Sequence, residues 1–345
     1  MGGPDLIGVV EAAYDLGLDD REWIAALVRS AAPHLDVGRG VFGFYFDASD
    51  PTHVRMWHPT DVGDTTLPMK MRLARDIARG RDAESLRRIA CGPTTVGSLS
   101  SELARHGLTE RSRPWVVLSG HLDYLGIRAC DAHMRGVSLA VPHAEPFVAP
   151  AATARRWSRI ASHIAAGYRL RRALHVANID PLVDDGDAVW APDGRCEHAQ
   201  GEARSQSARE ILRRAVLEMD SARTHTARSA ADDALSMWRG LVDGTWSLVE
   251  RFESDGRRYV VARKNEPGVL DPRGLTLREK QVVSFAALGH SNKLIAYELG
   301  VTHGTVTVHL TSAMAKLGAT TRAELTRLVS ELDASRPGVP HRESW

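Results

Sequence analysis

The sequence predicts a multidomain protein: an α+β N-terminal domain, a small α+β middle unit and an all-α C-terminal domain of four short helices. The 345 residues leave room for two or three domains, each able to bury its own core. Helical periodicity and strand-like alternation mix over the first two-thirds, whereas the last quarter shows helical periodicity with caps. Residues 265–274 hold two Pro and two Gly, which predicts a linker between these regions.

The N-terminal domain is predicted to span residues 1–176. Its predicted elements are, in order, helices over 5–33, strands at 40–46 and 53–57, helices near 67–90, strands at 115–118, 124–129 and 136–141, and a long helix over about 151–176. Gly17 and the cap at Asp19 and Asp20 divide the first helical stretch in two. A helix, a meander of strands and a closing helix form a pattern that resembles a GAF-like sensor domain.

The middle unit, residues 177–264, is predicted to hold two hairpins with helices between them. Its predicted elements are a hairpin of residues 188–190 and 195–198, helices at about 205–220 and 230–242, and a hairpin of residues 246–250 and 257–262. Pro-Asp-Gly at 192–194 and Ser-Asp-Gly at 254–256 supply the two turns. This compact α+β pattern resembles a reduced PAS-like unit.

The C-terminal domain, residues 275–332, is predicted to contain four helices because caps and apolar stripes recur there. Thr276 with Glu279, and Thr321 with Glu324, have the spacing of capping boxes for the first and last helices. The residues expected on the buried stripes are Val282, Val283, Phe285, Ala286, Ile295, Ala296, Leu299, Val306, Leu310, Met314, Leu317, Leu325, Leu328 and Val329.

Ser291 is predicted to cap the second helix and Thr302 the third, which runs to about Lys316. Only Gly300 and Val301 connect these two helices. Such a tight connection is what a helix-turn-helix requires.

The segments LTLRE (275–279), GHSNK (289–293), TVTVH (305–309) and KLG (316–318) fall on these helices. Over about residues 272–330 the chain resembles, without a gap, the DNA-binding domain of the LuxR family, also called the GerE or NarL type. The resemblance implies that the third helix enters the major groove, that the turn and the start of the second helix hold phosphates, and that the fourth helix serves dimerisation. Double-stranded DNA and a second copy of the chain are therefore the expected partners.

The resemblance assigns DNA contacts by position in the motif. The base-facing candidates are Thr307, Val308 and Thr311, and the candidates for phosphate or positioning contacts are Lys293, Thr302, Thr305 and His309. The family usually has lysine at Thr307, often a basic residue at Thr311, and usually glutamate at Leu294. The recognition surface is therefore nearly uncharged and offers no bidentate grip on guanine.

Between Leu275 and Ser330, six Lys or Arg stand against three Glu, a surplus of three positive charges. This small surplus predicts modest affinity for phosphates, so a homodimer is needed to combine two weak half-sites. The alternative is a regulator whose third helix docks on a partner protein instead of DNA. For the individual residues, the alternatives are a helix cap for Thr302, a solvated surface position for Lys293 and a packed position for His309.

The first two-thirds carry no sharp ligand-binding motif. They lack the phosphoacceptor signature of receiver domains, the aromatic and Asp constellation of acyl-homoserine-lactone sensors, and a Gly-rich phosphate loop of useful form. Candidates for either a ligand cavity or the core are Trp57, Trp115 and Tyr124. Candidates for a metal or thiol site are Cys130, His133, His121 and His143, but no second pair has ligand spacing. We expect no cofactor, metal or enzymatic activity; a small-molecule effector and RNA polymerase remain candidate partners.

The predicted helix over 151–176 carries an apolar stripe that either pairs with its copy in a second subunit or packs on its own sheet. The stripe consists of Trp157, Ile160, Ile164 and Tyr168. The arginines expected to form a solvated face around it are Arg155, Arg156, Arg159, Arg169, Arg171 and Arg172.

Bulk properties limit the location and the partners of the protein. A formal net charge of +1 gives no overall steering toward nucleic acid, so any attraction to DNA is local. Three widely spaced cysteines make no disulfide framework and fit a reducing compartment. We expect a cytoplasmic protein, because the sequence has neither a secretion signal nor a run of ~18 apolar residues. Residues 333–345 are predicted to be a disordered tail.

Overall fold

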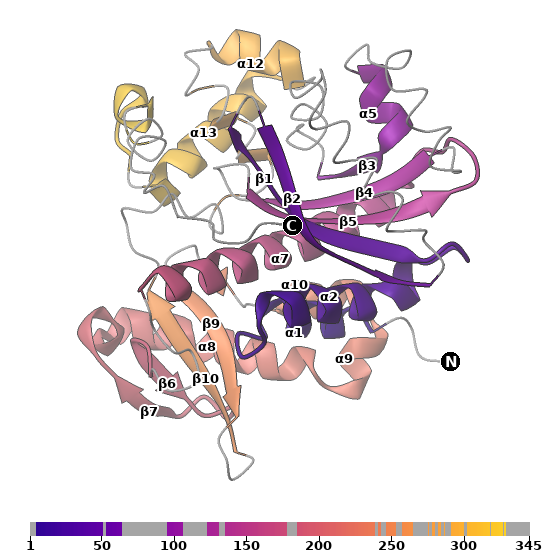
Figure 1. Cartoon of the computed structure of the whole chain (residues 1–345). Coiled ribbons are helices and arrows are strands. Elements are labelled where there is room, and N and C mark those ends of the chain that lie inside the picture. Colours follow the sequence, from indigo (N-terminus) through magenta and orange to yellow (C-terminus); the bar gives the residue numbers. More distant parts are fainter. Residues whose placement is uncertain are drawn as a thin grey trace. The chain divides into compact units, whose positions relative to one another are not determined.

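The computed structural model describes a defined subset of the chain. The described residues are 5–50, 53–63, 95–105, 123–130, 135–177, 185–238, 241–242, 246–252 and 257–264 and, nearer the C-terminus, 275, 278–279, 282–283, 286, 291–299, 302–317, 319–326 and 328. The chain divides into an N-terminal unit, Met1–Val242 with Trp246–Lys264, and a C-terminal unit, Asp243–Thr245 with Asn265–Trp345 (Figure 1). The helices predicted near 67–90, the strand at 115–118, the linker and the tail lie outside the described residues.

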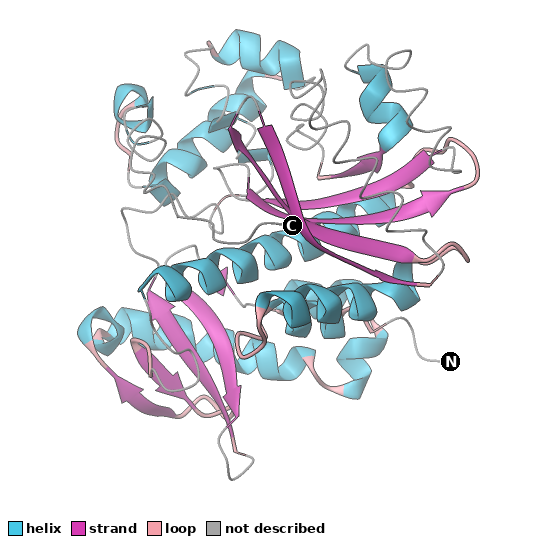
Figure 2. Ribbon diagram, viewed as in Figure 1, coloured by secondary structure: helices cyan, strands magenta, loops and turns pink. Residues whose placement is uncertain are grey.

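The first sheet of the N-terminal unit is antiparallel and has the strand order β2-β1-β5-β4-β3. Figure 2 draws the strands in magenta and the helices in cyan. Its strands are β1 (Val41–Asp50), β2 (His53–Val62), β3 (Val96–Ser98), β4 (Asp123–Cys130) and β5 (Arg135–His143). Four predicted strands are thereby confirmed. The short β3 and the following α5 (Leu99–Arg105) were not predicted, because a three-residue strand shows too little alternation to be recognised.

Three helices pack together beside this sheet: α1 (Ile7–Ala13), α2 (Asp20–Leu35) and α7 (Ala151–Ala177). The predicted break between the first two is confirmed, since Asp19 accepts from the Glu22 backbone N at 2.8 Å and Glu22 accepts from the Asp19 backbone N at 3.2 Å. Gly167 lets α7 approach α1 closely, because a Cβ there would collide with the backbone carbonyl of Ala13.

The apolar stripe of α7 packs within its own unit. Its four residues, from Trp157 to Tyr168, are all buried in the main hydrophobic core. The hypothesis that this stripe pairs with its copy in a second subunit is therefore wrong for this structure. The stripe is already covered by elements of its own unit, including the sheet and α1, so these four side chains are not exposed for association.

The expected solvated arginine face is wrong for two of its members. Arg169 is buried. Arg171 donates to the backbone carbonyls of Asp15 and Leu18, at 3.1 and 2.6 Å, and its guanidinium lies 5.2 Å from the centroid of the Trp23 ring. Arg171 thus satisfies the carbonyls of the turn between α1 and α2, a role that helical spacing alone does not reveal.

The second sheet of the N-terminal unit has the order β7-β6-β10-β9-β8 and is also antiparallel. Its strands are β6 (Ala188–Trp190), β7 (Cys196–Ala199), β8 (Leu241–Val242), β9 (Trp246–Phe252) and β10 (Arg258–Lys264). Both predicted hairpins are confirmed. Counted along the chain, the strands of this sheet follow the same spatial order as those of the first, second-first-fifth-fourth-third.

The helical part of this region lies between β7 and β8. It consists of the 3₁₀ turn η1 (Gly201–Arg204), α8 (Gln206–Ala222), α9 (His225–Ser229) and α10 (Ala231–Met237). The helix predicted over 230–242 is too long, because α10 stops at Met237 and Leu241 and Val242 pair with β9 as an edge strand. Pairing with a sheet here overrides the local helical pattern.

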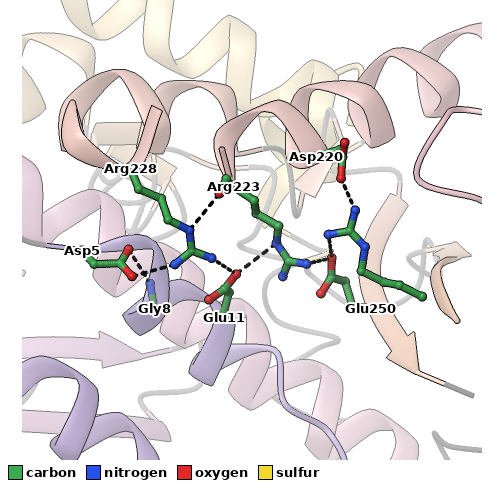
Figure 3. A network of polar contacts seen from close by, with 8 residues as sticks. Asp5, Gly8, Glu11, Asp220, Arg223, Arg228 and Glu250 are labelled. Atoms are coloured by element: carbon green, nitrogen blue, oxygen red, sulfur yellow. Dashed lines mark hydrogen bonds and ion pairs between the residues drawn. The ribbon is translucent and has the colours of Figure 1, made fainter. Parts of the chain in front are cut away.

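Both sheets contribute to one hydrophobic core, which includes Trp23 and Tyr45 of the first region and Trp190, Leu212 and Leu248 of the second. A chain of ion pairs also joins the start of the N-terminal unit to α8, α9 and β9 (Figure 3). No helix in the described part of the chain is both long and apolar enough to cross a membrane.

The C-terminal unit is built around α12 (Asn292–Leu299) and α13 (His303–Leu317). Residues 278–279, 282–283, 286, 322–326 and 328 are also helical, in agreement with the predicted first and fourth helices. A separate core joins these segments and includes Val282, Ile295, Val306, Leu310 and Leu325. The described members of the predicted stripes are buried in this core, except Met314, Leu317 and Leu328, which are partly buried against it. The side chains of Phe285, Leu299 and Val329 lie outside the described part.

Candidate nucleic-acid interface

The start of α13 is fixed by Thr302, as predicted. Its Oγ1 accepts from the Thr305 backbone N at 3.2 Å and lies 2.9 Å from the Thr305 Oγ1, and its carbonyl accepts from the Val306 backbone N at 3.2 Å. These bonds satisfy donors and acceptors at a helix N-terminus. Thr302 and Thr305 therefore set where the helix begins, whatever else they contact.

The two sides of α13 differ sharply in exposure. Val306, Leu310 and Ala313 are buried in the core of the C-terminal unit. Thr307, Val308 and Thr311 are exposed, and Val308 has a relative accessibility of 67%. Residues four apart share a helix face, so the three base-facing candidates lie together on the side turned away from the core.

The hydroxyl of Thr307 belongs to a hydrogen-bonded chain across three helical segments. It donates to the His303 carbonyl at 3.1 Å and accepts from Asn292 Nδ2 at 3.4 Å. Arg322 Nη1 in turn donates to Asn292 Oδ1 at 2.7 Å. Asn292 and Arg322 were not among the predicted site residues, because their contacts span 15 and 30 positions and leave no periodic signal.

Two further residues were predicted to contact phosphates, Lys293 and His309. Lys293 is exposed near the start of α12, and His309 is half-buried on α13. Position alone does not distinguish a phosphate contact from a solvated lysine or a packed histidine, so both assignments stay predictions.

Two of the three carboxylates of this region are engaged inside the unit. Glu279 is buried, and its Oε1 accepts from Ser312 Oγ at 2.6 Å. Glu324 Oε2 accepts from the backbone N and the Oγ1 of Thr320, at 2.8 and 2.7 Å, while the Glu324 backbone N donates to Thr321 Oγ1 at 3.1 Å. The predicted Thr321 cap is thus confirmed, but the carboxylate reaches one residue further back than predicted. Thr276 lies outside the described residues.

We expect Gly304→Ala to raise the free energy of unfolding of the C-terminal unit by about 1 kcal/mol. Gly304 is the second residue of α13, and a Cβ there would meet Thr302 Oγ1 at 3.8 Å, an ordinary van der Waals distance. Alanine would therefore lower the entropy of the unfolded chain without a clash. Thermal unfolding measures the change, with Gly167→Ala as a destabilising contrast. A lower melting temperature for Gly304→Ala would contradict the expectation.

Of the described N-terminal candidates, Tyr124 is buried, whereas Trp57, Cys130 and His143 are partly buried. The Trp57 ring stacks on Tyr45 with centroids 5.5 Å apart, and Tyr124 is buried edge-on against Phe42. His143 stacks on Phe147 at 3.8 Å. Within the described residues no three His, Cys, Asp or Glu side chains group as metal ligands would. Trp115, His121 and His133 lie outside the described residues.

Comparison with known proteins agrees with the geometry of the C-terminal unit. Residues 273–329 match the family model described as bacterial regulatory proteins, luxR family. An 85-residue stretch, 24% of this chain, is 34% identical to the transcriptional regulatory protein FixJ of Rhizobium meliloti (strain 1021). That stretch spans 42% of the length of FixJ. The C-terminal unit therefore carries a helix-turn-helix domain of the LuxR type, with α12 and α13 as its central helices.

Proposed function

We propose that the chain is a DNA-binding transcriptional regulator that recognises a specific operator as a homodimer, with α13 placed in the major groove. The observation that carries the proposal is the exposed face of α13, formed by Thr307, Val308 and Thr311. A recognition helix must present side chains to base edges while its opposite side stays packed on the domain. The burial of Val306 and Leu310 on that opposite side supports this arrangement.

Phosphate contacts are proposed for Lys293, Thr302, Thr305 and His309, which flank the base-facing residues. Lys293 is exposed, so its ammonium group can reach a phosphate without displacing any core contact. Thr302 and Thr305 stand at the N-terminus of α13, where the helix dipole favours negative charge.

The N-terminal unit is proposed to act as a sensor that sets dimer geometry or responds to a small molecule. The domain boundaries we propose are residues 1–176 for a GAF-like domain and 177–264 for a PAS-like unit. Two antiparallel five-stranded sheets with the same strand order support two related modules. RNA polymerase is the proposed partner through which such a regulator acts on transcription.

Selection of genomic fragments by the purified full-length chain tests the proposal. We expect the bound fraction to converge on one sequence with two related half-sites, since a homodimer presents two copies of α13. Enrichment no greater than that of bulk DNA would refute specific operator binding and favour docking of α13 on a partner protein.

Lys293→Glu is expected to weaken DNA binding uniformly across sequences, without changing which operator is preferred. Loss of one phosphate contact in each half-site should lower the salt dependence, d log K/d log[salt], by about 2 in magnitude. Titration of the selected duplex at several salt concentrations measures this slope.

Arg209→Glu is the matched control for that measurement. It reverses one positive charge at an exposed position of α8 in the N-terminal unit and should leave the slope unchanged. An equal loss of affinity in both variants would mean that Lys293 acts only through net charge.

A further inference from the structure

The three side chains at the centre of the exposed face of α13 all carry methyl groups. Val308 contributes two, and Thr307 and Thr311 contribute one each. Val308, at 67% accessibility, is the one large apolar side chain that the described part of the C-terminal unit leaves exposed. A single exposed valine is ordinary on a protein surface, so the inference depends on its neighbours.

Most of the hydrogen-bonding capacity of the Thr307 hydroxyl is used within the protein. Its hydrogen is used in the 3.1 Å bond to the His303 carbonyl, and one lone pair faces Asn292 Nδ2 at 3.4 Å. Asn292 is itself held by Arg322 at 2.7 Å, so this arrangement is fixed from two sides. The group of Thr307 that remains available is chiefly its methyl.

Among the described residues, the centre of the exposed face of α13 has no arginine or lysine that could hydrogen-bond to guanine. The described residues at its centre are two threonines and a valine, and none can donate two parallel hydrogen bonds to guanine O6 and N7. Arg322, which could, is drawn to Asn292 instead.

We propose that α13 recognises thymine through the C5 methyl group, with Val308 as the principal contact and the methyl groups of Thr307 and Thr311 beside it. The C5 methyl is the apolar feature that a thymine presents in the major groove, and burying it against aliphatic side chains is favourable. The inference rests on the proposed function and deepens it, because it assigns the class of base pair that the helix selects. The operator is therefore expected to carry thymine at the base steps that face Val308.

Replacement of single thymines by deoxyuridine tests this assignment directly. The duplex recovered by genomic selection serves as the probe, and each replacement removes one methyl group while keeping every hydrogen-bonding group of the base. At one or two positions in each half-site, affinity should fall about fourfold per methyl, hence about fifteenfold when both half-sites are changed.

Val308→Ala should make binding insensitive to deoxyuridine at those same positions. Val308 is exposed, so the variant should fold as the parent does. Val176→Ala provides the matched control, because Val176 is equally exposed, at 65%, on α7. It should retain the full response to deoxyuridine.

The possible outcomes test operator binding and methyl recognition separately. Specific binding that tolerates deoxyuridine at every position overturns methyl recognition and leaves operator binding intact. A deoxyuridine effect that persists unchanged in Val308→Ala overturns the assignment to Val308. Binding without any sequence preference overturns the proposed function, and methyl recognition with it.

Discussion

Replacing Arg223 with alanine is expected to lower the free energy of unfolding of the N-terminal unit by about 3 kcal/mol. Arg223 follows α8 and stands at the centre of the ion-pair chain in Figure 3. Its Nε lies 3.0 Å from Glu11 Oε1, and its Nη1 contacts Glu250 of β9. Its guanidinium also lies 5.0 Å from the centroid of the Trp238 ring.

The large effect follows from what remains after the arginine is removed. The side chains of Arg223 and Glu250 are each only 14% exposed, and burial raises the pKa of Glu250 even with Arg223 and Arg258 beside it. Without Arg223 the Glu250 carboxylate keeps one weaker partner, Arg258 Nη1 at 3.5 Å. A buried charge that loses its partner costs more than the pair contributed.

The pH dependence of this deficit has a definite sign. A carboxyl group whose pKa is raised in the folded state binds more protons there than in the unfolded state, so its penalty grows as pH rises through the folded pKa. The deficit of Arg223→Ala should therefore be smaller at acidic than at neutral pH. Urea unfolding followed by tryptophan fluorescence, at several pH values, measures it.

The double variant Arg223→Met with Glu250→Leu serves as the control. It replaces both charges by apolar groups and should recover much of the lost stability. A single-variant loss below about 1 kcal/mol would mean that the network acts as a solvated surface cluster.

Acidification below about pH 6.5 is expected to destabilise the N-terminal unit through His163. The ring of His163 on α7 is buried, and its Nδ1 lies 3.1 Å from the hydroxyl of Tyr14. Burial lowers the pKa of His163 from 6.5 to about 4. The unfolded state therefore binds the proton first as pH falls.

The size of the stability loss follows from how far burial lowers the pKa of His163. Stability contributed by the neutral histidine is full above pH 6.5 and is lost progressively down to about pH 4. The total loss is about 3 kcal/mol, at 1.36 kcal/mol for each pH unit of displacement. Chemical unfolding across this pH range measures the slope.

The double variant Tyr14→Phe with His163→Leu isolates the histidine from the carboxylates that titrate nearby. It removes both partners of the hydrogen bond, so neither of these two side chains leaves the other as an unpaired buried polar group. Its stability should fall less steeply between pH 6.5 and pH 4 than that of the parent chain. Identical slopes would show that His163 is protonated without cost.

Local contacts explain why much of the C-terminal unit could be predicted from the sequence. The Thr302 cap on α13 and the buried stripe from Val306 to Leu310 join residues three or four positions apart. Such contacts leave a periodic pattern in the chain. The exposure of Val308 is the complement of that stripe, and it follows from the same periodicity.

Contacts between distant residues could not be predicted in this way. The failed dimer hypothesis for the stripe of α7, the bonds of Arg171 to the turn after α1, and the short strand β8 all depend on which segments meet in the folded unit. None of these features alters the local spacing of residue types. Only packing and sheet pairing select among the alternatives.

The amino-acid sequence by itself predicted the Thr302 and Thr321 caps and the helical faces, because these depend on residues a few positions apart. Its resemblance over about residues 272–330 identified the LuxR-type helix-turn-helix domain. The tertiary structure alone decided the common strand order of the two sheets, the partners of Arg223 and the engagement of the Thr307 hydroxyl by Asn292 and, behind it, Arg322. The physical reason is that hydrogen bonds and ion pairs form wherever folding brings their groups together. Their partners are therefore fixed by the arrangement of whole elements in space.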